Sequence, residues 1–512
     1  MKTRHPFPLL AVTGISCLVL TGCFSSGPSG SSDTASDPSA AGGDGRVSIA
    51  MLQPPRSGLT PLSDDAFKLS RWSTAETLVV LDDLGEAQPA LATAWEQTTP
   101  MDWAFTLREG VTFHDGTPLT AEDVARSLTA AANASPTPRI LDGVELTAVA
   151  TGHLTVTVTT AVADPLVPQR LSSPQLSVLA AAAYEGDAVD PVGTGTGPFV
   201  LTAVDSTSGA TLDRNEDYWG DAAAAAGIDV QFVPDGNARA AALRTGTADV
   251  VEAIPVSQVA QIDEDLVFEV PMPRTNTLYL NTESGPFADP AVRAAAREAI
   301  DRATIVSTVY EGRADVAEGL LGPALPWAEE ERDDDYDAVL EARPEPAAVD
   351  GVRISLGTFT DRAELPEVAV QLEQQLEAAG FVVEQDVREY QFIEADALDG
   401  AFDAFILSRA TVLDSGDPVA YMFSDFACEG SFNISQFCDP EVDEAQRTAA
   451  ALPSGAERRE AIIAAEAEIL ARDAAIPMLH ERVIQGEAAG VEGAARDPRE
   501  RTLITGETRA GQ

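Results

Sequence analysis

The chain has 512 residues, of which 33 are lysine or arginine and 82 are aspartate or glutamate, so its formal net charge is -49 at pH 7. A surface this negative repels phosphate backbones and anionic lipid headgroups, which excludes nucleic acid as a partner and a basic patch as a membrane contact. The hydrophobic content of 45% is normal for a folded protein, and a chain of this length is expected to divide into two or three lobes.

The first residues have the layout of a secretory signal. Two basic residues precede an apolar run over residues 9–20, which is too short and too interrupted to span a membrane. Residues 20–23, Leu-Thr-Gly-Cys, resemble the lipobox of bacterial lipoproteins, and this resemblance implies cleavage before Cys23 and attachment of a lipid to its sulfur. An ordinary signal peptide with an unmodified cysteine is the alternative. We therefore expect a signal peptide over residues 1–22 and a membrane anchor at Cys23.

Residues 24–45 are rich in serine, glycine, alanine and aspartate and contain almost nothing that could be buried. Such a composition is typical of a flexible linker. We expect residues 23–45 to be a lipidated tether for the folded part of the chain.

The stretch from residue 89 to 128 predicts a hairpin followed by a helix. Large side chains alternate with small ones over residues 103–107, which is the period of a half-buried strand. A Glu-Gly turn at residues 109–110 is expected to return the chain through a second strand at residues 111–113. Thr120 then resembles a helix N-cap with Asp123 three residues later.

The same stretch carries a family resemblance that periodicity does not supply. Residues 103–124, WAFTLREGVTFHDGTPLTAEDV, are similar to the signature of extracellular solute-binding proteins of the peptide and nickel class, the receptors of ATP-driven (ABC) importers. Three further blocks agree with this class in order and rough spacing, so the resemblance covers essentially everything after the tether.

A glycine-rich block follows at residues 193–220. Its glycines do not form a phosphate-binding loop, because Gly197 is followed by proline and no Gly-Lys-Ser/Thr sequence appears. We interpret the block as a crossing between lobes that leads into a strand at residues 199–203, and the resemblance places Gly195 beside the ligand cleft. The aromatic pair within residues 217–220, Asp-Tyr-Trp-Gly, is interpreted as a packing anchor.

The next block, residues 275–323, predicts a strand at residues 277–280 and a helix capped by Asp289. Members of the class have the same strand and helix pair at the start of their third lobe. The resemblance makes Tyr279 and Asn281 candidate ligand contacts, with ordinary strand packing as the alternative.

An acidic run at residues 329–350 lacks the alternating ligands and central glycine of a calcium loop, and we expect it to be a solvated loop. Residues 351–359 predict a strand. An amphipathic helix that ends at Gly380 and a further strand follow. Alternation of this kind indicates α/β lobes.

Two cysteines remain once the signal and the lipidated residue are set aside. Cys428 and Cys438 can form a disulfide, because an exported chain folds in an oxidising compartment. Two free thiols are the alternative. A zinc ribbon is excluded, since no second cysteine pair or nearby histidine pair is present.

From the resemblance we expect a periplasmic-binding-protein-like type II α/β fold with two main lobes joined by a hinge and an additional lobe, the cluster C architecture. The hinge crossings are expected near residues 191–195 and 271–275. The expected parts are lobe I over residues 46–86, 192–272 and 479–512, the extra lobe II over residues 87–191, and lobe III over residues 273–478.

A peptide carries an ammonium and a carboxylate whatever its side chains, so a tolerant receptor needs one acidic and one basic residue in a closed cleft. In peptide-binding members an aspartate four residues before a proline binds the ammonium, and Asp414 stands four residues before Pro418. The alternative is that this aspartate only shapes its loop. For the carboxylate the resemblance points to Arg362, although counting back from Gly380 puts the family position nearer Phe359.

Direct binding of a metal ion is not expected, because the three histidines after the signal are scattered in sequence. A metal inside a small organic chelator remains an alternative ligand. We predict no cofactor.

The resemblance implies a lipid-anchored, extracytoplasmic receptor that captures peptides or peptide-like solutes and delivers them to a membrane permease and its ATPase. The tether would raise the local concentration of the receptor near its permease, and we expect a monomer. The alternatives are a sensor or adhesin lipoprotein of the same fold, or a metal-chelate, opine or sugar ligand. An enzyme is not expected, because no nucleophile elbow, zinc-protease helix or cysteine-histidine pair is present.

Overall fold

The computed structural model describes residues 45–511 apart from residues 187, 363 and 413–414, all within the unit Ala40–Gln512. The predicted signal peptide, most of the tether and Cys23 lie outside the described residues, as does Asp414. Among the described helices, none combines the length and the apolar character that crossing a membrane would require.

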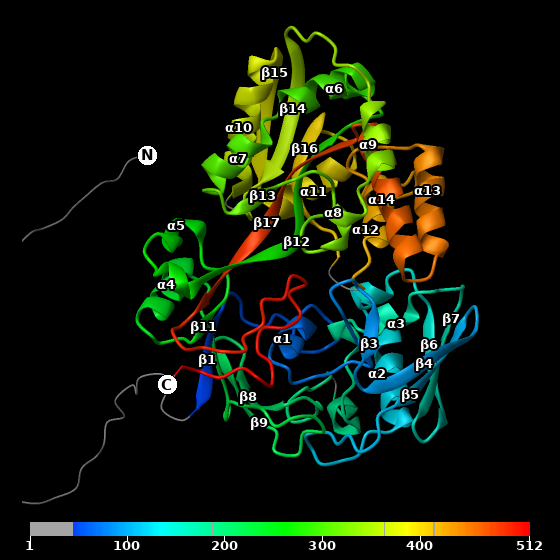
Figure 1. Cartoon of the computed structure of the whole chain (residues 1–512), viewed down its shortest axis with the longest axis vertical. Coiled ribbons are helices and arrows are strands. Elements are labelled where there is room, and N and C mark those ends of the chain that lie inside the picture. The colour runs from blue at the N-terminus through cyan, green and yellow to red at the C-terminus, as the bar shows by residue number, and fades with distance from the viewer. Residues whose placement is uncertain (1–44, 187, 363, 413–414, 512) are drawn as a thin grey trace, which may run out of the picture. The chain divides into compact units, whose positions relative to one another are not determined.

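A mixed sheet of eleven strands runs through the described part of the chain (Figure 1). Its parallel and antiparallel pairs place early and late segments of the sequence side by side. The strands lie in the order β15 (Phe381–Arg388), β14 (Val352–Phe359), β16 (Ala404–Ala410), β12 (Val267–Leu280), β17 (Ala475–Glu487), β11 (Val250–Val251), β1 (Arg46–Met51), β10 (Gly227–Phe232), β9 (Gly209–Arg214) and β8 (Phe199–Asp205), with β13 (Ala314–Val316) paired to β17.

A smaller antiparallel sheet corrects the predicted hairpin. Its strands lie in the order β4 (Ala92–Thr99), β5 (Asp102–Leu107), β7 (Thr155–Thr160) and β6 (Leu146–Gly152), and β2 (Val79–Leu81) pairs with β3 (Ala87–Pro89) nearby. Both edges of β5 are occupied by β4 and β7, so residues 111–113 cannot pair with it. They bond instead to the segment just after them, with the N–H of Phe113 donating to the carbonyl of Thr117. The second strand of the predicted hairpin is therefore wrong.

Helix α2 (Ala121–Ala132) confirms the predicted cap. The N–H of Thr120 donates to Oδ2 of Asp123 at 3.0 Å, as in a capping box. Val124 and Leu128 are fully buried on the face toward the small sheet.

The other α-helices cover the sheets and the segments between them. They are α1 (Ala66–Arg71), α3 (Val167–Arg170), α4 (Gly236–Arg244), α5 (Val256–Val259), α6 (Pro290–Ala299), α7 (Arg302–Val309), α8 (Trp327–Glu330), α9 (Asp334–Glu341), α10 (Glu364–Ala378), α11 (Tyr390–Leu398), α12 (Val419–Phe426), α13 (Pro440–Ala451) and α14 (Ala456–Ala471). The helix predicted after Asp289 is α6, and the side chain of Asp289 accepts the N–H of Ala291.

Helix α9 overturns part of the loop predicted for the acidic run. The carboxylate of Asp333 accepts the N–H groups of Asp335 and Tyr336, which caps the helix. The acidic residues of the first turn face the positive end of the helix dipole, and the ring of Tyr336 is buried. Part of the acidic run that we interpreted as a solvated loop therefore forms the first turn of helix α9.

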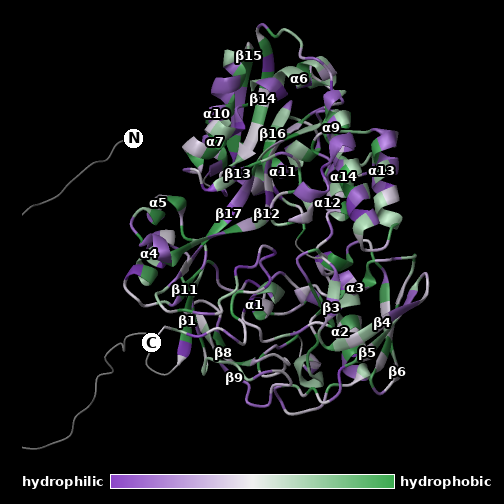
Figure 2. Cartoon of the chain, viewed as in Figure 1, coloured by the Kyte–Doolittle hydropathy of each residue, from purple (hydrophilic) through white to green (hydrophobic). Residues whose placement is uncertain are grey.

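Strands β12 and β17 form a long two-stranded ribbon that joins the two ends of the large sheet (Figure 1). Their register shifts once: Pro271 lies opposite Arg482, but Thr275 lies opposite His480, so three residues of β12 face a single residue of β17. This bulge coincides with the second predicted hinge crossing. The middle of β17, residues 480–482, is hydrophilic, whereas residues 475–479 and 483–484 are mainly apolar (Figure 2).

Four clusters of buried apolar side chains hold the sheets and helices together. The largest gathers residues from Leu278 to Leu479, and a second surrounds the small sheet between Leu78 and Ala180. Two smaller clusters centre on β1 and on α4. The lobe boundaries predicted from the sequence stay a prediction.

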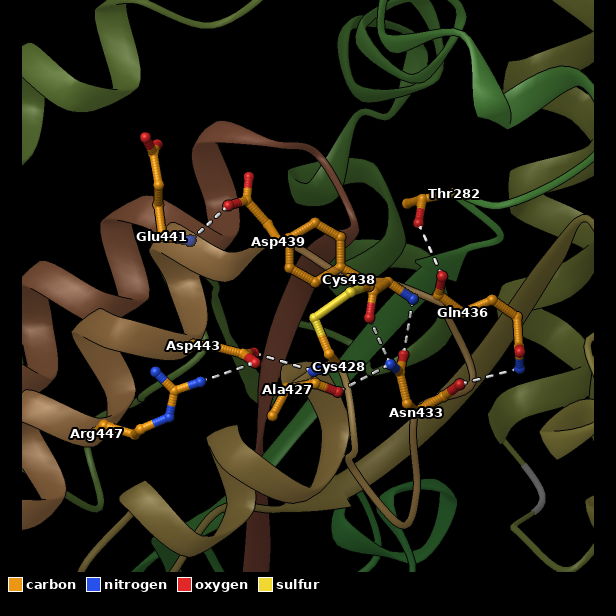
Figure 3. Close-up of a disulfide and its surroundings, with 11 residues drawn as sticks. Thr282, Ala427, Cys428, Asn433, Gln436, Cys438, Asp439, Glu441, Asp443 and Arg447 are labelled. Carbon is orange, nitrogen blue, oxygen red and sulfur yellow. Dashed lines mark hydrogen bonds and ion pairs between the residues drawn. A yellow bond between two sulfur atoms is a disulfide. The ribbon is translucent and has the colours of Figure 1, made fainter.

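Cys428 and Cys438 are joined by a disulfide between α12 and α13, with an S–S distance of 2.12 Å (Figure 3). Side chains fix the loop that the bond closes. The amide of Asn433 donates to the carbonyls of Ala427 and Phe437, and the carboxylate of Asp443 accepts the N–H of Cys428.

Candidate functional site

A cavity of about 990 Å³ lies where the ribbon of β12 and β17 meets the ends of β14 and β16. Segments near β1, α1 and α5 also contribute to its wall. Its size falls within the range of small-molecule sites in proteins.

The wall of the cavity is rich in arginine although the chain as a whole is acidic. Eight of its residues are basic and five are acidic, against 33 and 82 in the whole sequence, so basic groups are concentrated here. The basic residues are Lys68, Arg71, Arg139, Arg239, Arg274, Arg362, Arg409 and Arg482, and the acidic residues are Glu252, Asp361, Glu364, Glu481 and Glu500. A wall of this kind favours a solute with at least one anionic group.

Arg362 lies just beyond β14 and contributes to the wall, as its predicted role requires. Its Nη1 is 2.9 Å from Oε2 of Glu481, a carboxylate whose side chain is only 8% exposed. The guanidinium of Arg362 is therefore already neutralised by the protein. Its role as the partner of a ligand carboxylate stays a prediction.

Arg274 differs from every other basic residue in the described wall. Arg274 lies in the bulge of β12 and contributes to the cavity wall. Its side chain forms no ion pair and no hydrogen bond with any of the described residues, and its Nε is buried without a partner. Burial, and then the nearby cation of Arg362, lowers the pKa of Arg274, although the carboxylates of Glu500 and Glu481 oppose the shift. Its guanidinium thus faces the cavity with unused donors.

Arg409 on β16 is held in one orientation. Its Nε and Nη2 donate to the two carboxylate oxygens of Asp425 at 2.9 and 2.8 Å, and its guanidinium lies 4.2 Å from the ring centroid of Phe432. Asp425 is fully buried; burial raises its pKa, although the cation of Arg409 and the hydroxyl of Tyr279 oppose the shift. The pair fixes the guanidinium of Arg409 at the cavity wall.

Other basic residues in the wall are also neutralised. Arg71 forms an ion pair with Glu252. Burial alone would raise the pKa of Glu252, but the charge of Arg71 and the hydrogen bond from the N–H of Leu52 outweigh burial, so the pKa is lowered. Arg482 pairs with Asp315 and Glu269. The guanidinium of Arg239 is satisfied by main-chain carbonyls, including that of Ala253 at 2.7 Å.

The wall also holds carboxylates that the protein leaves free. Neither Glu364 nor Glu500 has an ion pair or a side-chain hydrogen bond among the described residues. The hydroxyl of Ser408, a residue only 7% exposed, likewise lacks a partner. Tyr310 and Tyr390 add aromatic surface. The cavity therefore offers unused groups of both signs.

Three other predicted ligand contacts lie outside the described lining. The hydroxyl of Tyr279 donates to Asp425 at 3.0 Å, and the amide of Asn281 donates to the carbonyl of Gly400, both from buried positions. Gly195 belongs to a close crossing of main chains. The side chains of Tyr279 and Asn281 are thus both bonded within the protein, and their role as ligand contacts stays a prediction. The placement of Asp414 stays a prediction, because it lies outside the described residues.

The first two sequence blocks of the family resemblance, residues 103–124 and 193–220, meet each other away from the cavity. We use the name signature region for Glu76, His114, Gly195, Gly197 and Trp219 together with the residues that contact them. The N–H of His114 donates to the carbonyl of Gly195, and its Nε2 lies 2.9 Å from the carbonyl of Gly197. A Cβ atom at Gly195 would lie 2.0 Å from the carbonyl oxygen of Thr74, so only glycine fits this crossing.

Glu76 lies at the centre of the signature region. Its carboxylate accepts hydrogen bonds from the hydroxyls of Thr196 and Tyr218 and from the indole N–H of Trp219, at 2.7 to 2.9 Å. Burial raises the pKa of Glu76 although these donors oppose it. The guanidinium of Arg108 covers the ring of Trp219 at 4.3 Å. The aromatic pair is thus a packing anchor, as we interpreted it.

Sequence reasoning missed Arg274 and Arg409 as residues of the wall. Arg274 follows two closely spaced prolines in PMPR, a signal of an irregular strand that could have drawn attention to it. Arg409 has no comparable signal, because its partner Asp425 is sixteen residues further along the chain.

Within the described residues, no group of three or more histidine, cysteine, aspartate or glutamate side chains is arranged to hold a metal ion. The histidines are dispersed over the described part of the chain. His480 is buried in β17 next to Thr275, and burial lowers its pKa to about 4.

Known proteins resemble this chain over about half to nearly three quarters of its length. It is 25% identical over 381 residues to the nickel-binding protein NikA of Staphylococcus aureus, covering 72% of this chain and 75% of the relative. It is 27% identical over 261 residues to a probable di/tripeptide-binding protein 5 of Pseudomonas aeruginosa, which covers 49% of each.

The fold is shared with solved structures. The nickel ABC transporter structure from Bacillus halodurans superposes with a TM-score of 0.77 at 24% identity, covering 91% of this chain and 100% of that one. Together with the mixed α/β sheets, this likeness confirms the predicted periplasmic-binding-protein-like type II fold.

The sequence profile of the bacterial extracellular solute-binding proteins, family 5 Middle, matches residues 86–433. The match begins just before β3 and ends within the disulfide loop, so it includes most of the cavity wall and the signature region apart from the segment around Glu76. Because it covers more than half of the chain, the protein belongs to the family 5 solute-binding proteins, the class that serves peptide and nickel ABC importers.

Proposed function

We propose that the protein captures a small peptide or peptide-like solute in the cavity and delivers it to the permease of an ABC importer. The observation that carries this proposal is the wall of the cavity, which presents unneutralised groups of both signs: Arg274 on one strand, and Glu364 and Glu500 on other segments. A zwitterionic solute would satisfy both kinds of group at once. The family membership supports capture and delivery.

A metal chelate is the second candidate cargo. The relative from Staphylococcus aureus is named for nickel binding, and an arginine-rich wall suits the carboxylates of an organic chelator. The described residues hold no cluster that would bind a bare ion. The chelator rather than the metal would therefore be recognised.

We also propose that the protein is exported and held at the membrane through a lipid on Cys23. The support is the sequence of residues 1–23 and the membership of an extracellular family. The variant Cys23→Ala should move the protein from the membrane fraction to the soluble exported fraction. Retention of this variant in the membrane fraction would contradict the lipid anchor.

The cargo is tested by native mass spectrometry of solute that co-purifies with the chain, followed by a thermal-shift screen of di- and tripeptides. A solute present at 100 times its Kd should add about 2.7 kcal/mol of apparent stability. Amino-terminal acetylation of an active peptide should reduce the shift, and so should Asp414→Asn if this residue binds the ammonium. Binding of chelates but of no peptide would select the second candidate.

A further inference from the structure

The basic residues of the cavity wall do not have equal freedom to bind a solute. Among the eight, seven have an ion pair or hydrogen bonds within the described protein, and Arg274 has neither. An arginine removed from water without a direct ion pair or hydrogen bond destabilises a folded protein, and nearby carboxylates such as Glu500 and Glu481 offset only part of this cost for Arg274. The cost is compensated when a ligand supplies the missing anion.

The position of Arg274 on the ribbon directs its side chain. Residues 272–274 of β12 face Glu481 alone, because the register of β12 and β17 shifts between Pro271 and Thr275. A bulge of this kind bends the strand and re-aims the side chains within it. Prolines on either side of Met272 cannot donate to the ladder, so the irregularity is built into the sequence.

A second unsatisfied group lies on the same face. On the other edge of β12, Arg274 is opposite Ala410 and Asn276 is opposite Ser408, so all four side chains lie on one face of the sheet. The hydroxyl of Ser408 is buried without a partner, and the residue contributes to the cavity wall. A guanidinium and a hydroxyl with unused donors on one face form a suitable site for a carboxylate.

Arg362 is the competing residue, because the family resemblance assigns the carboxylate to it. However, its charge is balanced by Glu481 at 2.9 Å. A ligand carboxylate at Arg362 would have to share the guanidinium with Glu481 and would be repelled by it. Arg274 has no direct ion pair, since Glu500 and Glu481 act on it only through longer-range electrostatics, so a ligand carboxylate would give it a contacting counter-ion.

We propose that Arg274, assisted by Ser408, is the main binding site for a carboxylate of the solute. The inference deepens the proposed function and rests on it, since it assumes that this cavity captures a solute. Because Arg274 lies in the bulge of the ribbon, the bound carboxylate contacts the strand pair where hinge movement is expected.

The decisive measurement is calorimetric titration of the full chain with trialanine, with trialanine carboxamide and with citrate. These probes separate a peptide carboxylate, its neutral analogue and a carboxylate without a peptide. The variants are Arg274→Gln, Arg274→Lys and Arg362→Gln. The matched control is Arg353→Gln, which removes an arginine that is 73% exposed and paired with the exposed Glu384.

We expect the wild type to prefer trialanine over its carboxamide by about tenfold or more, since a charge-assisted hydrogen bond is lost with the amide. Arg274→Gln should reduce this ratio to near one, Arg274→Lys should restore part of it, and Arg362→Gln should leave most of it. The free Arg274→Gln protein should melt no lower than the wild type, because an unpaired cation has been removed. A structural role for Arg274 would not produce this combination.

Three results would overturn the inference. The first is an unchanged acid-to-amide ratio in Arg274→Gln, and the second is loss of the ratio in Arg362→Gln alone. The third is that each of the three probes binds to Arg274→Gln as tightly as to the wild type. If citrate binds through Arg274 while no peptide binds, the inference is supported and the proposal of a peptide cargo is contradicted. If peptides bind equally well to the wild type and to Arg274→Gln, the proposal of a peptide cargo is supported and the inference is contradicted.

Discussion

The signature region and the cavity wall use buried charge in opposite ways. In the signature region both carboxylate oxygens of Glu76 are satisfied by protein donors, and glycines allow two main chains to cross in contact. In the cavity wall Arg274 and Ser408 keep unused donors. A polar network in which every group is hydrogen-bonded stabilises one structure, whereas buried donors without acceptors gain free energy when a ligand supplies the acceptors. The signature motif at residues 103–124 therefore lies in a structural joint, whereas the solute site that we propose lies in the cavity wall.

The largest effect is expected from Gly197→Ala in the signature region. A Cβ atom there would lie 2.1 Å from the carbonyl oxygen of Ser73, and neither main chain can move without disrupting the crossing. We expect a loss of more than about 5 kcal/mol, enough to prevent folding. Yield of folded protein and circular dichroism measure it.

The control for this variant is Gly193→Ala. Gly193 has a φ of 65°, but its added Cβ would meet no atom within 4 Å. We therefore expect only the cost of backbone strain, a decrease of about 1 kcal/mol in the free energy of unfolding measured with urea. Equal stability of the two variants would show that close crossing does not explain the glycine-rich block.

A large effect is also expected in the cavity wall, from Asp425→Asn. The change leaves the guanidinium of Arg409 without its counter-charge beside a fully buried position. We expect a loss of about 3 kcal/mol in urea unfolding. Glu384→Gln, which breaks the exposed pair with Arg353, is the control and should change stability by less than about 0.5 kcal/mol. Similar losses for both would contradict the role of burial.

A pH-dependent effect is expected at the ribbon. The Thr275 hydroxyl donates to the carbonyl of Leu320, so it accepts the Nδ1 proton of a neutral His480. The pKa of His480 is about 4 in the fold against 6.5 ordinarily, so the unfolded chain takes up the proton first as pH falls. Stability from this group should decrease by up to about 3 kcal/mol between pH 6.5 and pH 4.

The variant His480→Asn keeps a donor toward Thr275 and should remove this part of the pH dependence, as measured by urea unfolding at a series of pH values. His153→Asn is the control, because His153 is exposed. An unchanged slope in His480→Asn would show that other groups titrate in this range.

The smallest effect is expected from Arg108→Gln in the signature region. It removes the cation over the ring of Trp219 and the bond from Nε to the carbonyl of Ala90. We expect a loss of about 1 kcal/mol of stability with unchanged solute affinity. A change in affinity of about tenfold would break the separation between the signature region and the cavity wall.

Local patterns in the sequence were sufficient for many elements. The alternation at residues 103–107, the Asp289 cap before α6 and the capping box of Thr120 all act over a few residues, so local chemistry determines them. The acidic run was misinterpreted because its charges were counted and the local cap at Asp333 was overlooked. The burial of Tyr336, in contrast, depends on what packs against α9.

The pairing of strands was beyond the reach of local patterns. Nothing between residues 103 and 113 shows that β4 and β7 occupy both edges of β5. Non-local pairing depends on the whole fold, whereas a turn depends on its own residues.

The sequence by itself determined the family, the fold class, two helix caps and several individual strands and helices, because these depend on short-range spacing and on motifs of contiguous residues. Only the tertiary structure decided which charges are already used. Whether Arg274 or Arg362 is free depends on Glu481, which lies more than a hundred residues from either and reaches the site through the pairing of β17. Electrostatic pairing follows distance in space, and a fold brings remote residues within a few ångströms.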